Sequence, residues 1–128
     1  LGHGIVGTVQ ASNAGWATGT RLTWNMAVSC RNCPACARGL SQKCETLVKY
    51  GHSTLPFSGG LASHVVLRRG TTAVPVPASV PLKLAALINC SVATAAAMVR
   101  VAAPSPNQSA AVFGGGGLGL MLTAQLIS

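Results

Sequence analysis

Acidic residues are almost absent from this chain. Glu45 is the single acidic residue among 128, against nine lysines and arginines, which gives a formal net charge of +8. A basic excess of this size is typical of proteins that bind nucleic acid, anionic membranes or phosphate-bearing ligands. Here the excess comes from the missing acids, because the basic residues are few and, apart from Arg68 and Arg69, stand singly. The sequence therefore argues against a basic stripe that binds nucleic acid.

Long apolar runs and a leader sequence are also missing. Lys83, Arg100 and Pro104 interrupt the most apolar stretch, so no uninterrupted run reaches the roughly 18 residues of a membrane span. The chain starts at Leu1, without a methionine or a secretory signal, and we expect a cut end in a cytoplasmic protein with no membrane partner. Because 49% of the residues are hydrophobic, the chain can form one domain with an apolar core.

The chain divides into a strand-rich part and a helix-rich part. Strand-forming residues occupy three short runs, at 5–9, 22–28 and 62–67. The alanine-rich stretch 82–101 predicts one or two helices. A polar, proline-containing segment at 104–109 indicates a boundary, and it precedes a short apolar strand at 110–113 and the opening of a helix at 120–128.

Cysteines are clustered. Four of the five are separated by two, two and seven residues: Cys30, Cys33, Cys36 and Cys44. This spacing lets closely placed thiolates surround one ion while the fourth completes a tetrahedron, which favours zinc. The alternatives are a pair of disulfides or four free thiols, but nothing in the sequence indicates an oxidising compartment. We predict a structural zinc ion, because four thiolates leave no open position for a substrate.

A glycine-rich turn is the second motif. Gly114, Gly116 and Gly119 form the pattern GxGxxG between the predicted strand at 110–113 and the predicted helix. Such glycines permit a tight turn and the close approach of a pyrophosphate, whose charge is favoured at a helix N-terminus. The alternative is a flexible glycine linker. The strand before the turn and the apolar residues after it favour a dinucleotide site.

The remaining residues that could bind metal are isolated in the sequence. His3 and Cys90 lie far apart along the chain, and by spacing alone each is an ordinary core or surface residue. His52 and His64 are expected to be core or surface residues with no metal role.

Taken in order along the chain, these motifs resemble the zinc-dependent alcohol dehydrogenases of the medium-chain dehydrogenase/reductase superfamily. The resemblance covers nearly the whole chain and depends on Gly2-His3-Gly4, Gly19-Thr20-Arg21-Leu22, the four clustered cysteines, Gly59-Gly60-Leu61-Ala62, and Asn89-Cys90 with Thr94. Two further segments are similar to a subgroup associated with phosphonate catabolism: Gln42-Lys43-Cys44-Glu45 and Lys49-Tyr50-Gly51-His52.

The resemblance implies a mixed α/β chain. A GroES-like, β-rich catalytic domain would span residues 1–103, with the zinc lobe at about 30–44, and the first βα unit of a truncated Rossmann domain would span 107–128. The implied reaction is the oxidation of an alcohol to a carbonyl with NAD or NADP, so the expected partner is a small alcohol or aldehyde. A homo-oligomer is compatible with this resemblance.

The resemblance also implies roles for single residues. His3 and Cys90 would be two ligands of a catalytic zinc ion, whose remaining cysteine ligand lies in the family upstream of the Gly2-His3 motif, where this chain has no residues. Thr94 would lie beside the nicotinamide, and Gly114, Gly116 and Gly119 would contact the cofactor.

Three acidic positions of the family are occupied by other residues here, namely Gly4, Thr20 and Ser63. Loss of groups that surround a metal typically costs ~10- to 100-fold in affinity or activity. The acidic residue that reads the ribose lies ~20 residues beyond the glycine turn, past Ser128, so NAD and NADP both remain open. We therefore expect this chain on its own to be inactive or incomplete. The alternative is a non-enzymatic, zinc-stabilised basic module that binds a partner or nucleic acid, with an affinity that falls steeply with salt.

Overall fold

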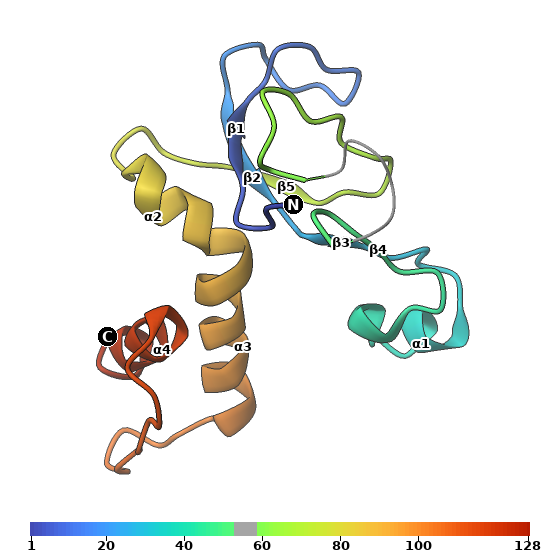
Figure 1. The fold of residues 1–128 in the computed structure, drawn as a ribbon. Coiled ribbons are helices and arrows are strands. Elements are labelled where there is room, and N and C mark those ends of the chain that lie inside the picture. Colours follow the sequence, from blue (N-terminus) through green and yellow to red (C-terminus); the bar gives the residue numbers. More distant parts are fainter. Residues whose placement is uncertain (53–58) are drawn as a thin grey trace.

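A small antiparallel sheet organises the first part of the chain. The computed structural model describes residues 1–52 and 59–128 (Figure 1). Strands β1 (Val6–Thr8), β2 (Arg21–Trp24) and β5 (Ala73–Pro75) pair in the order β1-β2-β5. Pro75 in β5 lies opposite Leu22 in β2. A proline is tolerated there because β5 is an edge strand of this sheet.

A second, two-stranded ladder carries the cysteine lobe. Strand β3 (Ala27–Val28) pairs with β4 (Val48–Lys49), and the chain between them forms α1 (Pro34–Ala37) and the 3₁₀ turn η1 (Ser41–Lys43). This lobe projects from the sheet on the side away from the long helices (Figure 1).

The apolar core lies between the sheet and the ladder. Among the described residues, its buried side chains are Ile5, Leu22, Trp24, Val28 and Tyr50. Tyr50 is only 1% exposed, and its hydroxyl accepts the backbone N–H of Arg68 at 2.7 Å. Burying a tyrosine ring with a satisfied hydroxyl stabilises the core without leaving a polar group unpaired.

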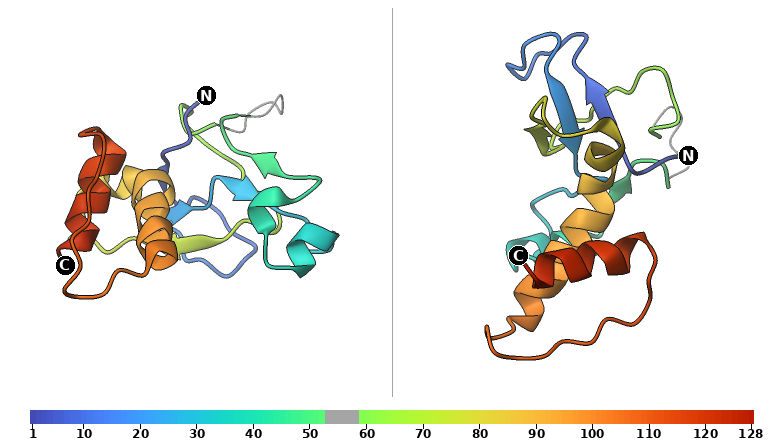
Figure 2. Two further views of the ribbon diagram at one scale, coloured as in Figure 1. Left: turned by 90° about the horizontal axis from the view of Figure 1, so that it is seen from below. Right: turned by 90° about the vertical axis from the view of Figure 1, so that its left-hand side faces the viewer.

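The helical part is a long rod with one helix against it. Helix α2 (Leu82–Leu87), the π-helical turn η2 (Ile88–Val92) and α3 (Ala93–Ala102) follow one another without interruption. Helix α4 (Gly117–Leu126) lies beside α3 in both views of Figure 2, and the Gln125 side-chain amide donates to the Val92 carbonyl at 3.2 Å. The rod ends at Ala103, whose left-handed backbone (φ 41°) stops the helix.

The structure confirms the expected mixed α/β content and the helices at 82–101. The expected strand at 22–28 is broken into β2 and β3, because the Asn25 side chain hydrogen bonds to the Ala27 carbonyl and turns the chain. Strands β4 and β5 were not anticipated. The helix predicted at 120–128 begins three residues earlier, at Gly117.

Two predicted strands are wrong. Residues 62–67 form no strand, and Val66 is left 85% exposed. Residues 110–113 form none either, and Phe113 is 99% exposed. Within the described part of the chain no strand lies parallel to this segment, and an apolar βα strand of this kind forms only inside a sheet.

The helical rod is apolar enough to cross a membrane by length and composition alone. Residues Leu82–Ala102 form a helix of 21 residues, and an 18-residue window within it has a mean hydropathy of 1.7. Lys83 and Arg100 lie within this helix, but these two charged residues do not exclude a membrane span. A single such helix is weak evidence, because core helices of soluble proteins share these properties.

Candidate metal centre and cofactor turn

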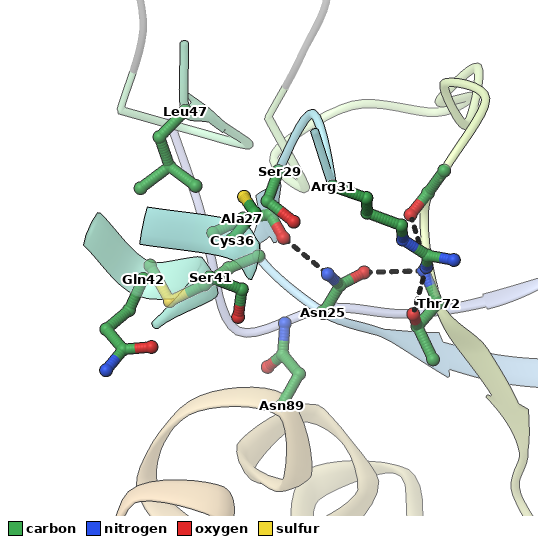
Figure 3. Close-up of a pocket in the computed structure, with 12 residues that line it drawn as sticks. Asn25, Ala27, Ser29, Arg31, Cys36, Ser41, Gln42, Leu47, Thr72 and Asn89 are labelled. Atoms are coloured by element: carbon green, nitrogen blue, oxygen red, sulfur yellow. Dashed lines mark hydrogen bonds between the residues drawn. The ribbon is translucent and has the colours of Figure 1, made fainter. Parts of the chain in front are cut away.

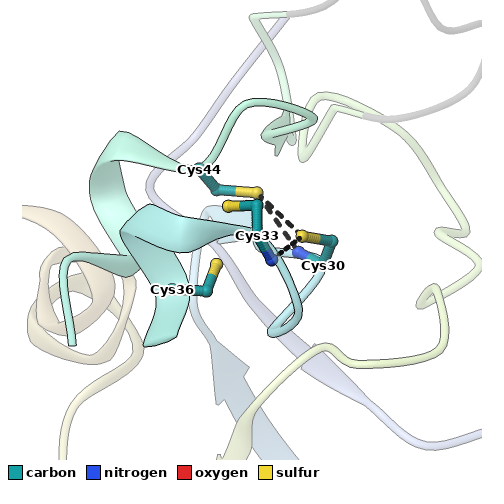
Figure 4. A group of neighbouring side chains, drawn as sticks. All are labelled: Cys30, Cys33, Cys36 and Cys44. Carbon is teal, nitrogen blue, oxygen red and sulfur yellow. Dashed lines mark hydrogen bonds between the residues drawn. The ribbon is translucent and has the colours of Figure 1, made fainter. Parts of the chain in front are cut away.

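The four clustered cysteines meet at one point in the lobe. All four Sγ atoms lie within 4.8 Å of one another (Figure 4). Cys30 follows β3, Cys33 directly precedes α1, Cys36 lies within α1, and Cys44 follows η1. The thiols therefore converge because two short helical turns fold back on the end of β3.

Local backbone geometry produces this convergence. Pro34 occupies the first turn of α1, where its missing N–H costs nothing. The turn after Cys36 is closed by the Gly39 N–H, which donates to the Cys36 carbonyl at 3.0 Å, and Gly39 has a positive φ of 77°. Arg31, at a φ of 59°, donates to the Gly70 carbonyl at 3.3 Å and so ties the lobe to the chain before β5.

The four thiols do not have equal proton affinities. Backbone N–H groups of Asn32 and Cys33, helped by the Cys44 thiol, lower the pKa of Cys30 to about 6. The backbone N–H of Glu45 lowers the pKa of Cys33. Burial, together with the neighbouring thiols, raises the pKa of Cys36 to about 11. Amide N–H groups that donate to a sulfur stabilise its thiolate and so lower its pKa. The thiols around Cys36 oppose a further negative charge there, and a bound cation would offset that repulsion.

The donor set and its spacing fit a tetrahedral zinc ion. Zn–S bonds of about 2.3 Å place the sulfurs of a tetrahedron roughly 3.8 Å apart, and Cys44 Sγ lies 3.5 Å from Cys30 Sγ. A disulfide requires a sulfur separation of about 2.05 Å, and all five cysteines are free. The cluster therefore fits a structural zinc site with every position filled by protein.

His3 lies at a different place, on the loop before β1. Its Nδ1 atom is buried and has no hydrogen-bond partner among the described residues. Its ring stacks on His52 with 4.7 Å between the ring centroids. A buried imidazole nitrogen without a partner is costly, and a metal ion is one group that would satisfy it.

Cys90 lies on the π-helical turn η2, next to the His3 loop. Cys90 is half-buried, and the side-chain amide of its neighbour Asn89 donates to the His3 carbonyl at 2.7 Å. Thr94 is exposed in the first turn of α3. Among the residues that the structure describes, His3 and Cys90 belong to no group of three or more ligands, so the catalytic metal role of this pair stays a prediction.

The glycine turn lies at the start of α4. Gly114 has a φ of 110°, which other residues rarely adopt, and Gly116 is the N-cap of the helix. A Cβ atom at Gly119 would overlap the Gly114 carbonyl oxygen, whereas Gly117 has open space around it. Two of the three motif glycines thus have a backbone reason to be glycine. Their contact with a cofactor stays a prediction.

Two features of the site were not found from the sequence. His52 was expected to have no metal role, and its stacking on His3 depends on a contact that no local pattern reveals. A pocket of about 390 Å³ lies between the lobe and the β2–β3 turn, with Asn25, Arg31, Cys36, Thr72 and Asn89 in its wall (Figure 3). The sequence indicates nothing for Asn89 beyond its place next to Cys90.

Comparison with known proteins identifies the first part of the chain. Residues 1–78 match the alcohol dehydrogenase GroES-like domain. The chain is 32% identical over 127 residues to a probable D-xylulose reductase A of Neosartorya fischeri, covering 97% of this chain and 34% of that protein. It is 35% identical over 129 residues to a probable cinnamyl alcohol dehydrogenase 8D of Oryza sativa subsp. japonica, covering 92% of this chain and 35% of that protein.

Solved structures show the same fold. Galactitol-1-phosphate dehydrogenase from Escherichia coli superposes with a TM-score of 0.82 at 24% identity, covering 99% of this chain and 36% of that one. The alcohol dehydrogenase of Aeropyrum pernix superposes with a TM-score of 0.74 at 28% identity, covering 99% of this chain and 38% of that one. The chain thus spans about a third of the length of the relatives it matches. It belongs to the alcohol dehydrogenase GroES-like domain family, within the zinc-dependent, medium-chain alcohol dehydrogenases.

Proposed function

We propose that this chain supplies the substrate-side part of a zinc-dependent oxidoreductase that oxidises an alcohol to a carbonyl with a nicotinamide cofactor. The single observation that carries the proposal is the four-cysteine cluster, with all Sγ atoms within 4.8 Å, in a chain of this family. Since the chain spans about a third of its relatives' length, the activity is proposed for a protein that contains it.

The proposed reaction centre is separate from the lobe. His3 and Cys90 are the proposed ligands, supported by the unpartnered His3 Nδ1 and by the hydrogen bond between Asn89 and the His3 carbonyl. When bound, zinc there supplies a Lewis acid for the substrate oxygen and the nicotinamide supplies the hydride acceptor. Thr94 is the proposed neighbour of the nicotinamide, at the exposed start of α3.

Several finer features belong to the same proposal. Residues 1–103 form the GroES-like domain, and residues 107–128 are the start of a Rossmann domain whose cofactor, NAD or NADP, contacts Gly114, Gly116 and Gly119. The substrate is a small alcohol or aldehyde, and the protein is soluble and cytoplasmic. The exposed apolar side chains of the helical part, such as Leu84, Met98 and Leu120, would then be covered by the rest of the Rossmann domain.

Zinc stoichiometry tests the proposal most directly. The protein that contains this chain together with the upstream cysteine ligand is purified under reducing, metal-replete conditions, and zinc is counted by mass spectrometry in wild type and in a Cys33→Ser, Cys36→Ser double variant. Two zinc ions in wild type and one in the variant support both centres. One zinc that vanishes in the variant leaves a structural site alone and refutes the reaction centre. No zinc in wild type refutes both.

Cofactor binding separates the dehydrogenase from the basic binding module. Binding of NADH and NADPH is measured by fluorescence titration, and retention on immobilised nucleic acid is measured at rising salt. The two functions predict opposite results in these two measurements. Cofactor binding without salt-sensitive retention supports the dehydrogenase. Retention that falls steeply with salt, without cofactor binding, would support the basic binding module instead of the dehydrogenase.

A further inference from the structure

The backbone on both sides of Gly4, directly after His3, is held by one side chain. The Asn89 amide nitrogen donates to the His3 carbonyl at 2.7 Å, and the Asn89 amide oxygen accepts the Ile5 N–H at 3.4 Å. These two bonds span Gly4 and join segments more than 80 positions apart in sequence. A primary amide offers a donor and an acceptor side by side, so it can pair with both backbone groups at once.

The far side of the same loop is fixed by the sheet. The buried hydroxyl of Thr23 donates to the Ile5 carbonyl at 2.8 Å, and the Ile5 side chain is 4% exposed in the core. Ile5 is thus held at its N–H by Asn89 and at its carbonyl by β2. Among the described residues, His3 is held by the Asn89 amide at its carbonyl and by the stacked His52 ring.

Gly4 permits the close approach that this arrangement requires. A Cβ atom at Gly4 would lie 2.8 Å from the carbonyl oxygen of Ala86. That contact is with helix backbone, so any side chain at position 4 would push the end of α2 away from the loop. The turn that follows is the π-helical η2, which contains both Asn89 and Cys90. Single π turns occur frequently at functional sites.

We propose that Asn89 is a positioning residue, which holds His3 at the distance and orientation from Cys90 that a shared metal ion requires. This inference rests on the proposed function, because it takes His3 and Cys90 as ligands. Partners that orient the ligands of a metal typically contribute 10- to 100-fold to its affinity. Asn89 acts through the His3 backbone and does not itself touch the metal.

Three variants test this role. Asn89→Ala removes both hydrogen bonds, while Asn89→Asp keeps an acceptor for the Ile5 N–H and loses the donor to the His3 carbonyl. Gln125→Ala is the matched control, because Gln125 donates to the carbonyl of Val92 at the end of the same π-helical turn, rather than to the His3 loop. Circular dichroism establishes that each variant is folded.

The readouts are stepwise zinc binding, by competition with a chromophoric chelator, and the ¹⁵N resonances of the His3 imidazole. Both Asn89 variants are expected to weaken the second zinc equivalent by about 10- to 100-fold, to shift the His3 ring resonances and to leave the first equivalent unchanged. Gln125→Ala is expected to change neither. A second equivalent that binds as in wild type in both Asn89 variants, or that weakens equally in Gln125→Ala, would overturn the assignment.

Failure of the proposed function gives a different result. If the wild-type protein, with the upstream cysteine ligand present, binds a single zinc ion, the reaction centre at His3 and Cys90 is refuted. The hold of Asn89 on the His3 loop is then judged in the metal-free protein by the His3 ring resonances and by hydrogen exchange at the Ile5 amide. Changed His3 resonances in Asn89→Asp, together with faster Ile5 exchange in Asn89→Ala, support it. Wild-type values for both overturn it.

Discussion

The clustered cysteines of the lobe differ in protonation state although they share one site. The pKa of Cys30 is lowered to about 6 by backbone N–H donors, so this thiol is largely ionised at neutral pH. The pKa of Cys36 is raised to about 11 by burial and by the adjacent thiols, so this thiol is protonated without a cation. A zinc ion must therefore displace at least the Cys36 proton, because only thiolates bind it.

Zinc affinity is expected to rise with pH between 7 and 8. The zinc-bound lobe holds at least one proton fewer than the free lobe, so raising the pH favours binding, by about tenfold per pH unit for each proton released. Competition with a chromophoric chelator at the two pH values measures this. A pH-independent affinity would contradict the raised pKa of Cys36.

The double substitution Cys33→Ser and Cys36→Ser is expected to abolish zinc binding in the lobe. Two of four thiolates are lost, and the hydroxyls that replace them are poor zinc ligands. Cys90→Ser is the matched control, because Cys90 lies outside the cluster, and it should retain the lobe zinc. Metal analysis after dialysis decides the outcome, and a zinc ion retained by the double variant would exclude the four-cysteine site.

Among the elements, α4 depends on a backbone contact in its first turns. The Gly114 carbonyl lies where a Cβ atom at Gly119 would be, so the chain before the helix passes directly over its surface. Position 117 has open space and an ordinary backbone conformation. Two glycines of the same helix therefore differ in what a methyl group would meet.

Gly119→Ala is expected to destabilise this turn by about 1–3 kcal/mol, the usual cost of forcing atoms into filled space. It should also lower the affinity for NADH, if the turn holds the cofactor. Gly117→Ala is the control, and alanine should be neutral or slightly stabilising there because it favours helix. Hydrogen exchange in α4 and fluorescence titration with NADH measure the two effects. Equal exchange in the two variants would contradict the close contact.

For the molecule as a whole, the two motifs recognised in the sequence lie at opposite ends. The cysteine lobe projects at one end, and α4 with its glycine turn lies at the other (Figures 1 and 2). The lobe is joined to the rest through the β3–β4 ladder and through the hydrogen bonds of Arg31 to Gly70 and Thr72. A change in the lobe should therefore stay local.

Removal of zinc with a chelator is expected to loosen residues 30–49 first. Binding of the ion is coupled to the folding of the lobe, whereas the β1-β2-β5 sheet is stabilised by the buried side chains Leu22 and Trp24 and by Ile5 just before β1. Hydrogen exchange with and without chelator should show faster exchange in the lobe and unchanged protection in the sheet. Loss of protection throughout the chain would show that the zinc ion supports the whole fold.

Much of the site was accessible from sequence because the information is local. The spacing of Cys30, Cys33, Cys36 and Cys44 restricts the thiols to one small loop, so their convergence in the structure was predictable. The helix-forming alanines of 82–101 act through local propensity in the same way. By contrast, the strands expected at 62–67 and 110–113 did not form, because a strand requires a partner that local propensity does not specify.

The sequence by itself determined the family, the cysteine cluster and the helical stretch, because each depends on residues close together in the chain. Only the tertiary structure decided how the His3 loop meets the π-helical turn, that Asn89 pairs with the backbone on both sides of Gly4, and that His52 stacks on His3. These contacts join residues tens of positions apart. Their distances depend on how the sheet, the loop and the helices pack against one another, which no local pattern encodes.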